Sequence, residues 1–160
     1  MQNRIGHGHD IHRIVDGRPL ILGGVKIDAP FGLLGHSDGD AVLHSICDAI
    51  LGALGRGDIG KLFPDTDERY RGADSADLLT RVVELMKGAS LRIGNVDVTI
   101  SAERPRLGPY RQAICARIAE LLGTDAAAIN LKAKTNEGLD AIGRGEAIAA
   151  TAVVLLVPAA

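Results

Sequence analysis

The order of apolar and polar residues predicts interleaved strands and helices along the chain. Between Ile93 and Ala102, apolar residues alternate with polar ones, which is typical of a half-buried strand. From Ala147 to Val157 the run is almost continuously apolar and predicts a central strand covered on both faces. Apolar residues spaced three and four apart predict helices. In this way we expect strands at residues 4–12, 20–27, 93–102, 129–135 and 147–157, and helices at 38–54, 75–87 and 110–122.

This order of elements predicts an α+β fold, in which a mixed β-sheet carries its helices on one face. A length of 160 residues fits a single domain, residues 1–160, and no internal repeat or low-complexity segment divides it. The other face of the sheet needs a cover because the last strand is so apolar. Other copies of the same chain are the cover that we expect.

Polar residues mark the helix starts and one long loop. Ser37 or Asp38 is expected to cap the first helix, and Ser75 the second. On the first helix, His44 and Asp48 are four residues apart, so they share a face that differs from the apolar stripe. The segment 55–72 is long and irregular, which is typical of a functional or mobile loop.

Charge and composition argue against several classes of protein. A net charge of −2 and a pI near 6.2 leave no basic surface for nucleic acid or an anionic membrane, and two Phe and two Tyr are too few for a stacking platform. No apolar run approaches the ~20 residues that a membrane helix requires. Cys47 and Cys115 are expected to be buried free thiols. No signal peptide opens the sequence, so our interpretation is a reducing, cytoplasmic compartment.

Two short motifs carry the candidate chemistry. The first, at residues 6–12, reads GHGHDIH, and the second, at residues 35–44, reads GHSDGDAVLH. If the first motif is a strand, Asp10 and His12 point to the same face, because side chains alternate with a period of two. With His44 they make three nitrogen and oxygen ligands and leave a fourth position open. That arrangement is typical of catalytic zinc.

Residues 4–12 and 32–44, which contain these two motifs, and four later stretches together resemble the 2-C-methyl-D-erythritol 2,4-cyclodiphosphate synthase family of the non-mevalonate isoprenoid pathway. The later stretches lie at residues 57–67, 94–97, 132–137 and 143–146, in one order and with the expected separations. The resemblance spans nearly the whole chain. It implies a phosphorus–oxygen lyase that converts 4-diphosphocytidyl-2-C-methyl-D-erythritol 2-phosphate into the cyclic diphosphate and CMP. It also implies a homotrimer with the sheets around a three-fold axis and active sites between subunits.

The resemblance assigns roles to individual residues. Asp10, His12 and His44 would bind zinc, and Glu137 would bind Mg²⁺ or Mn²⁺ together with substrate phosphates. His36 and Thr135 would be the catalytic contacts to phosphate. The substrate, a cytidine diphosphate derivative, would be held by Asp10, His12, His36, Ser37, Asp58, Ile59, Gly60, Phe63, Pro64, Asp65, Thr66, Asp67, Ala102, Pro105, Arg106, Leu107, Lys134, Thr135, Asn136, Glu137 and Arg144.

Some of these residues can also be interpreted without the family resemblance. The turn at His36 and Ser37 precedes a helix, and the N–H groups at a helix N-terminus attract anions, so this turn suits a phosphate beside the metal. His7 and His9 match no ligand position and are expected to be structural. The sequence departs from the commoner family pattern at Lys134-Thr135-Asn136 and at Ala141, within the nucleotide pocket and near the expected three-fold axis.

Two alternatives remain at this point. A zinc hydrolase would use a metal-bound water on a phosphoester or amide, and Asp40 or Asp58 would be its general base. A non-catalytic trimeric binding module is the other alternative, against which the intact ligands Asp10, His12, His44 and Glu137 argue.

Overall fold

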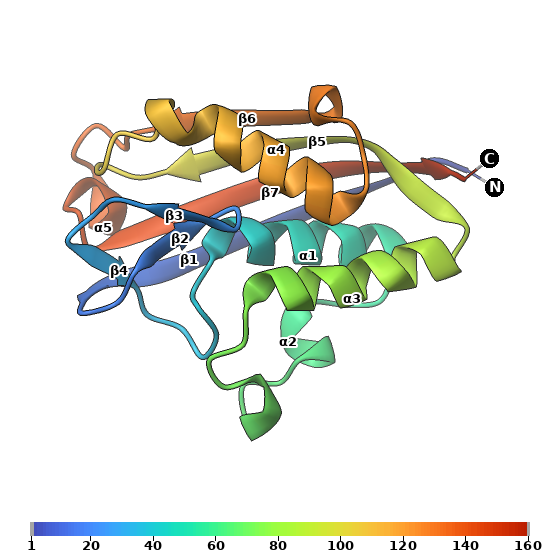
Figure 1. Ribbon diagram of the computed structural model, residues 1–160, viewed down its shortest axis with the longest axis horizontal. Coiled ribbons are helices and arrows are strands. Elements are labelled where there is room, and N and C mark those ends of the chain that lie inside the picture. Colours follow the sequence, from blue (N-terminus) through green and yellow to red (C-terminus); the bar gives the residue numbers. More distant parts are fainter. Residues whose placement is uncertain (1, 160) are drawn as a thin grey trace.

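A five-stranded mixed sheet forms the centre of the molecule, with the strand order β4-β1-β7-β5-β6 (Figure 1). The computed structural model describes residues 2–159. Strands β5 and β6 are parallel and every other neighbouring pair in this sheet is antiparallel. The strands of this sheet are β1 (Arg4–Asp16), β4 (Phe31–Leu33), β5 (Leu91–Ser101), β6 (Ile129–Lys134) and β7 (Ala147–Pro158).

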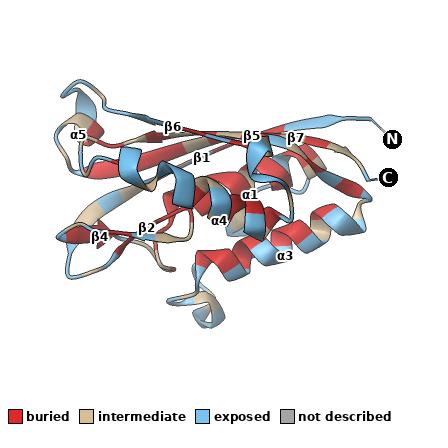
Figure 2. Ribbon diagram, turned by 45° about the horizontal axis from the view of Figure 1, so that its top comes forward, coloured by how far each residue is buried: buried red, intermediate tan, exposed pale blue. Residues whose placement is uncertain are grey.

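The principal helices lie on one side of the sheet (Figure 2). They are α1 (Ala41–Leu54), α3 (Ser75–Gly88) and α4 (Arg111–Leu122), and short helical turns form α2 (Ile59–Leu62), α5 (Asp140–Gly143), η1 (Glu68–Tyr70), η2 (Gly108–Tyr110) and η3 (Ala126–Ala128). The expected α+β class, with helices on one face of a mixed sheet, is therefore confirmed. None of the helices among residues 2–159 is long and apolar enough to cross a membrane.

Two glycines of β1 let α1 lie directly against the strand. A Cβ on Gly6 would stand 1.7 Å from the carbonyl oxygen of Ala49, and one on Gly8 would stand 1.9 Å from that of Ser45. Any side chain at either position would therefore push the helix away. Because side chains alternate along a strand, Asp10 and His12 share the helix-facing side of β1 with the glycines. His7 and His9 lie on the opposite face.

Several expected elements differ in detail. The single strand 20–27 is wrong: Gly23 and Gly24, both at positive φ, turn the chain between β2 (Leu20–Leu22) and β3 (Val25–Ile27), which pair as a separate hairpin. β4 was not expected, because its three residues are too few to show a periodicity. Asp40, not Ser37 or Asp38, caps α1, and Asp74, not Ser75, caps α3.

The face of the sheet without helices stays partly open in the single chain. β7 is central, as expected, but it is not covered on both faces, since Val153 is 42% exposed and Ile5 on the adjacent β1 is 74% exposed. The expectation for the thiols is half right. Both are free, and Cys47 is buried, but Cys115 is only half-buried because it lies at the edge of the core face of α4.

Candidate active site

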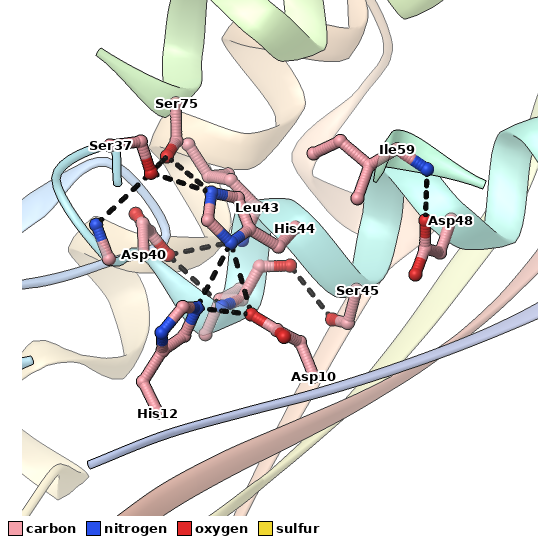
Figure 3. A network of polar contacts seen from close by, with 12 residues as sticks. Asp10, His12, Ser37, Asp40, Leu43, His44, Ser45, Asp48, Ile59 and Ser75 are labelled. Carbon is pink, nitrogen blue, oxygen red and sulfur yellow. Dashed lines mark hydrogen bonds and ion pairs between the residues drawn. The ribbon is translucent and has the colours of Figure 1, made fainter. Parts of the chain in front are cut away.

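Asp10, His12 and His44 converge as the two motifs predicted. The His12 Nε2 atom lies 2.7 Å and the His44 Nδ1 atom 3.0 Å from Asp10 Oδ2, and the two imidazole nitrogens are 3.2 Å apart (Figure 3). Two ligands come from β1 and the third from the start of α1. The glycines of β1 allow this helix to lie close enough to the strand for the three side chains to meet. Among residues 2–159, these three are the only group of three or more His, Cys, Asp and Glu side chains spaced to hold a metal ion.

The three donors fit zinc. Zinc–nitrogen and zinc–oxygen bonds of about 2.0–2.1 Å set neighbouring donors of a tetrahedron about 3.3 Å apart, close to the separations in this cluster. One carboxylate and two imidazoles also match the nitrogen and oxygen donors that zinc prefers. The His12 ring is fixed by its Nδ1 atom, which lies 2.6 Å from the carbonyl oxygen of Leu34, so its Nε2 atom is the one that faces the other ligands.

Electrostatic interactions within the cluster favour an ion pair between Asp10 and His12. Burial raises the pKa of the Asp10 carboxyl, but hydrogen bonds and charge from His12 and His44 outweigh burial and hold that pKa well below its usual range. For His12, burial lowers the pKa, yet the bond to Asp10 brings the net value above its usual range. Asp10 is therefore ionised at neutral pH, as a metal ligand must be.

A cavity of about 380 Å³ opens beside the cluster. Its lining contains nine of the residues expected at the metal and substrate, together with Tyr70 and Leu78, which sequence reasoning missed. The expected residues that line it are His12, His36, Ser37, His44, Ile59, Gly60, Phe63, Pro64 and Asp65. The cavity therefore joins the metal ligands to the long loop at residues 55–72.

Contacts on both sides hold that loop in place. The backbone N–H of Ile59 donates to Asp48 on α1 at 2.7 Å, so the polar face shared by His44 and Asp48 has a role in placing the loop. Farther along, the rings of Phe63 and Tyr70 meet edge to face at 5.2 Å, and the Arg81 guanidinium on α3 lies 5.8 Å from the Tyr70 ring centre.

The helix N-terminus does not provide the expected anion site. The Asp40 carboxylate accepts from the N–H groups of Val42 and Leu43 and also from those of Gly23 and Gly24. A negative charge of the protein itself therefore occupies the N-terminus of α1. His36 and Ser37 line the cavity through their side chains instead.

A second cavity of about 720 Å³ gathers most of the expected nucleotide-binding residues. It is lined by Ala102, Pro105, Arg106, Leu107, Lys134 and Thr135, and also by Glu103, Gly108, Pro109, Arg111, Leu131, Lys132 and Ala133. The two cavities share no lining residue. One chain therefore presents the metal ligands and the expected nucleotide pocket as separate surfaces.

Glu137 lies in a tight loop just after β6. Its backbone adopts a φ of +53°, and its exposed carboxylate accepts from the Thr135 hydroxyl at 3.4 Å. Glu103, which sequence reasoning missed, accepts from the backbone N–H of Asn136 at 2.8 Å and from that of Gly138 at 3.3 Å. Its position between the expected pocket residues Ala102 and Pro105 was the only signal that pointed to it.

The remaining expected residues line neither cavity. Asp58 caps α2 by accepting from Lys61 N, and Asp67 pairs with Arg69 while its carbonyl oxygen lies 3.4 Å from His36 Nε2. Thr66 is exposed on the same loop. Arg144 is exposed and forms a two-pronged pair with Glu146 in the turn before β7.

Comparison with known proteins assigns the chain to a family. The sequence matches the YgbB family over residues 3–157, and the chain belongs to that family. Relatives named 2-C-methyl-D-erythritol 2,4-cyclodiphosphate synthase include one from Shouchella clausii, 56% identical over 153 residues that cover 96% of both chains. Another, from Geotalea uraniireducens, is 58% identical over 96% of this chain and 98% of its own. The resemblance noted in the sequence is thereby confirmed.

Solved structures agree with this assignment. IspF of Plasmodium falciparum, in a complex with CDP, superposes with a TM-score of 0.87 at 42% identity, over 99% of this chain and 97% of its own. The bifunctional IspDF from Campylobacter jejuni superposes with a TM-score of 0.93 at 42% identity. That match covers 97% of this chain and 42% of the bifunctional protein, so this chain corresponds to one part of it.

Proposed function

We propose that this protein is a 2-C-methyl-D-erythritol 2,4-cyclodiphosphate synthase, a phosphorus–oxygen lyase. The observation that carries the proposal is the convergence of Asp10, His12 and His44 beside a cavity lined by the long loop. Family membership and relatives of that name, at more than half identity over nearly the full chain, support it. The two free thiols fit a reducing compartment such as the cytoplasm.

Asp10, His12 and His44 would hold a zinc ion. A bound zinc would act as a Lewis acid that neutralises charge on a phosphoryl group and holds it in place. The chain supplies the rest of the site: His36 and Ser37 line the same cavity, where their side chains would donate to phosphate and polyol oxygens. Ile59, Gly60 and Phe63 of the loop shape the other wall, where the methylerythritol part would bind.

The reaction would be an intramolecular phosphoryl transfer. An oxygen of the 2-phosphate attacks the β-phosphorus of the same substrate molecule, a new P–O bond closes the ring, and the bond from the β-phosphorus to the bridging oxygen breaks. CMP leaves with that oxygen and its electron pair. The attacking phosphate is already ionised, so no protein nucleophile is needed. Proximity, in-line orientation and charge neutralisation are the terms that the protein contributes.

The second half of the site would come from the stretches around Ala102–Leu107 and Lys134–Glu137. Their cavity, of about 720 Å³, has the size for a cytosine nucleotide, which backbone groups of these stretches would recognise. Glu137, exposed at the loop after β6, would bind Mg²⁺ or Mn²⁺ bridging substrate phosphates, and Thr135 beside it would contact the diphosphate. Arg144, held by Glu146, would lie at the edge of this half.

These two halves would meet in a homotrimer. Within one chain the cavities share no lining residue, and the open face of the sheet exposes Ile5, Ile11 and Val153. Packing three sheets around a common axis would bury those side chains and repeat the combined site three times. The expected site between subunits is part of this proposal.

Neither candidate for the general base of a zinc hydrolase is free to act as one. Asp40 is fully buried, and four backbone N–H groups occupy its carboxylate oxygens, while Asp58 is engaged in capping α2. The relatives from Shouchella clausii and Geotalea uraniireducens are named as synthases, not as hydrolases.

The deciding experiment is phosphorus NMR of the purified protein with the diphosphocytidyl 2-phosphate substrate, zinc and magnesium. Cyclic diphosphate with one CMP supports the proposal, whereas inorganic phosphate or CMP without cyclic product refutes it.

A further inference from the structure

The side chain of Ser75 has a role other than the helix cap that the sequence predicted. Asp74 caps α3 by accepting from the N–H of Ala76 at 2.8 Å. Ser75 is the first residue of the helix and is completely buried. Its hydroxyl points toward His44 (Figure 3).

His44 faces the metal cluster and Ser75 with opposite sides of its ring. Its Nδ1 atom lies among the other two ligands, 3.0 Å from Asp10 Oδ2. Its Nε2 atom lies 2.9 Å from the Ser75 hydroxyl oxygen and 3.1 Å from that of Ser37. The ring nitrogen that points away from the metal site therefore contacts two hydroxyl groups.

A carboxylate stands behind the Ser75 hydroxyl. The Ser75 Oγ atom makes a short hydrogen bond to Asp38 Oδ1. A hydroxyl has one proton, and an ionised carboxylate can only accept. Ser75 therefore donates to Asp38 and uses a lone pair to accept from His44 Nε2–H. Metal binding through Nδ1, the atom that faces the metal site, requires the proton of the neutral imidazole to lie on Nε2, and the Ser75 hydroxyl accepts that proton there.

Asp38 is itself held from several directions. Its Oδ2 atom accepts from the Ser75 backbone N–H at 3.1 Å, and its Oδ1 atom accepts from that of Asp40 at 3.1 Å. Its own N–H donates to the carbonyl of Ala73 at 3.1 Å, and Gly72 N donates to His36 O at 2.7 Å. The start of α3 and the turn before α1 are thereby locked together, so the Ser75 hydroxyl has little freedom to turn away.

We infer that Ser75 and Asp38 are positioning residues for the metal ligand His44. They fix the tautomer and orientation of its ring, and the carboxylate raises the affinity of Nδ1 for a cation, through a carboxylate–hydroxyl–imidazole chain. The inference deepens the proposed function and rests on the metal site that it assigns. It also gives α3, which contributes no ligand, a direct connection to the metal centre.

Ser37 is a weaker substitute for Ser75. Its Oγ atom is also within reach of His44 Nε2, but it accepts from Gly39 N at 3.3 Å and has no carboxylate contact among the described residues. If the Ser75 hydroxyl were lost, Ser37 Oγ could still accept from His44 Nε2–H, but the Asp38 carboxylate would no longer be connected to the imidazole. The expected effect is weaker metal binding rather than a missing site.

The test measures zinc affinity by competition with a chromophoric chelator in Ser75→Ala, Ser75→Thr and a matched control, Ser45→Ala. Ser45 is equally buried, but its hydroxyl donates only to the carbonyl of Val42. We expect the zinc dissociation constant of Ser75→Ala to rise about 10- to 100-fold. We expect Ser45→Ala to bind zinc as the wild type does, and Ser75→Thr, which keeps the hydroxyl, to recover most of the affinity.

Two further measurements separate positioning from folding. Urea unfolding with excess chelator should show comparable losses of stability for Ser75→Ala and Ser45→Ala. Nitrogen NMR of labelled imidazoles in the wild type should show the His44 proton on Nε2. Unchanged zinc affinity in Ser75→Ala, or a proton on Nδ1 in the wild type, overturns the inference and leaves the proposed function intact. Failure of the wild type itself to bind zinc overturns both.

Discussion

Gly8 on β1 lies so close to Ser45 on α1 that a Cβ at Gly8 would stand 1.9 Å from the Ser45 carbonyl oxygen. This contact sets the distance between the strand that carries Asp10 and His12 and the helix that carries His44. The metal cluster therefore depends on a residue with no side chain, two positions before its first ligand.

Replacing Gly8 by Ala should displace α1 and weaken both fold and metal site. We expect a loss of about 3 kcal/mol in the free energy of unfolding, because the helix backbone has to move, and a clear drop in bound zinc. Gly52→Ala is the matched control, since a Cβ there meets only the His7 carbonyl at 3.9 Å. Urea unfolding and metal analysis check both variants. Equal stability and zinc content for the two would contradict the close-packing argument.

His44→Ala should abolish stoichiometric zinc binding. Two ligands from one strand cannot complete the three protein donors that a catalytic zinc site requires. We expect zinc to fall from about one per chain to near zero in metal analysis of the purified protein, with activity falling in parallel. Near-stoichiometric zinc without His44 would show that the ligand set is wrong.

Glu137→Gln should keep zinc and lose most of the activity. The change removes one charge from an exposed loop, so the fold should survive, while stabilisation of the transferring phosphate is lost. We expect kcat to fall about 100-fold at limiting magnesium, with zinc content unchanged. Turnover equal to the wild type under these conditions would refute the role given to Glu137.

Mixing two inactive chains should restore activity if the site lies between subunits. With random exchange between equal amounts of His44→Ala and Glu137→Gln chains, about one quarter of the sites in a cyclic trimer pair two intact halves. We therefore expect about a quarter of the wild-type activity. A mixture of His44→Ala with His12→Ala is the control, because both changes fall in the same half and none should return. If mass spectrometry shows exchange and the first mixture stays inactive, the shared-site model fails.

Asp40 should give the fold a measurable dependence on pH. Burial raises the pKa of its carboxyl from 3.8 to about 6, against backbone N–H bonds from Gly24, Leu43 and Gly23 that lower it, and the charge of Asp38 adds to the rise. A raised pKa in the folded state means that the stability Asp40 contributes is fully present below about pH 3.8 and is lost as the pH rises through about 6.

Asp40→Asn isolates this effect, because Asn does not titrate. The free energy of unfolding of the wild type minus that of the variant should fall by about 3 kcal/mol as the pH rises through this window. Urea unfolding at several pH values, with chelator present in both samples, measures the difference. A difference that grows with pH would mean that the four N–H bonds keep the carboxylate ionised despite its burial.

The periodic elements and the ligand set could be read from the sequence. Alternation at 93–102 and helical spacing at 41–54 are local properties of the chain, and burial of one face follows from them directly. Asp10, His12 and His44 could be grouped because two of them alternate along one strand and the third starts a helix. The spacing of residues along the chain carries this information, whatever lies around them.

Only the tertiary structure decided which polar groups meet. Ser37, Asp38 and Asp40 are all good capping residues, and Asp40 caps α1 because Gly23 and Gly24 of a distant hairpin donate to the same carboxylate. Ser75 looks like a cap in the sequence and instead contacts His44, 31 positions away. The division of the expected site residues into two separate cavities likewise depends on where β1 and β6 lie in the sheet. Such long-range hydrogen bonds join residues that are far apart in the chain, and local periodicity contains no information about them.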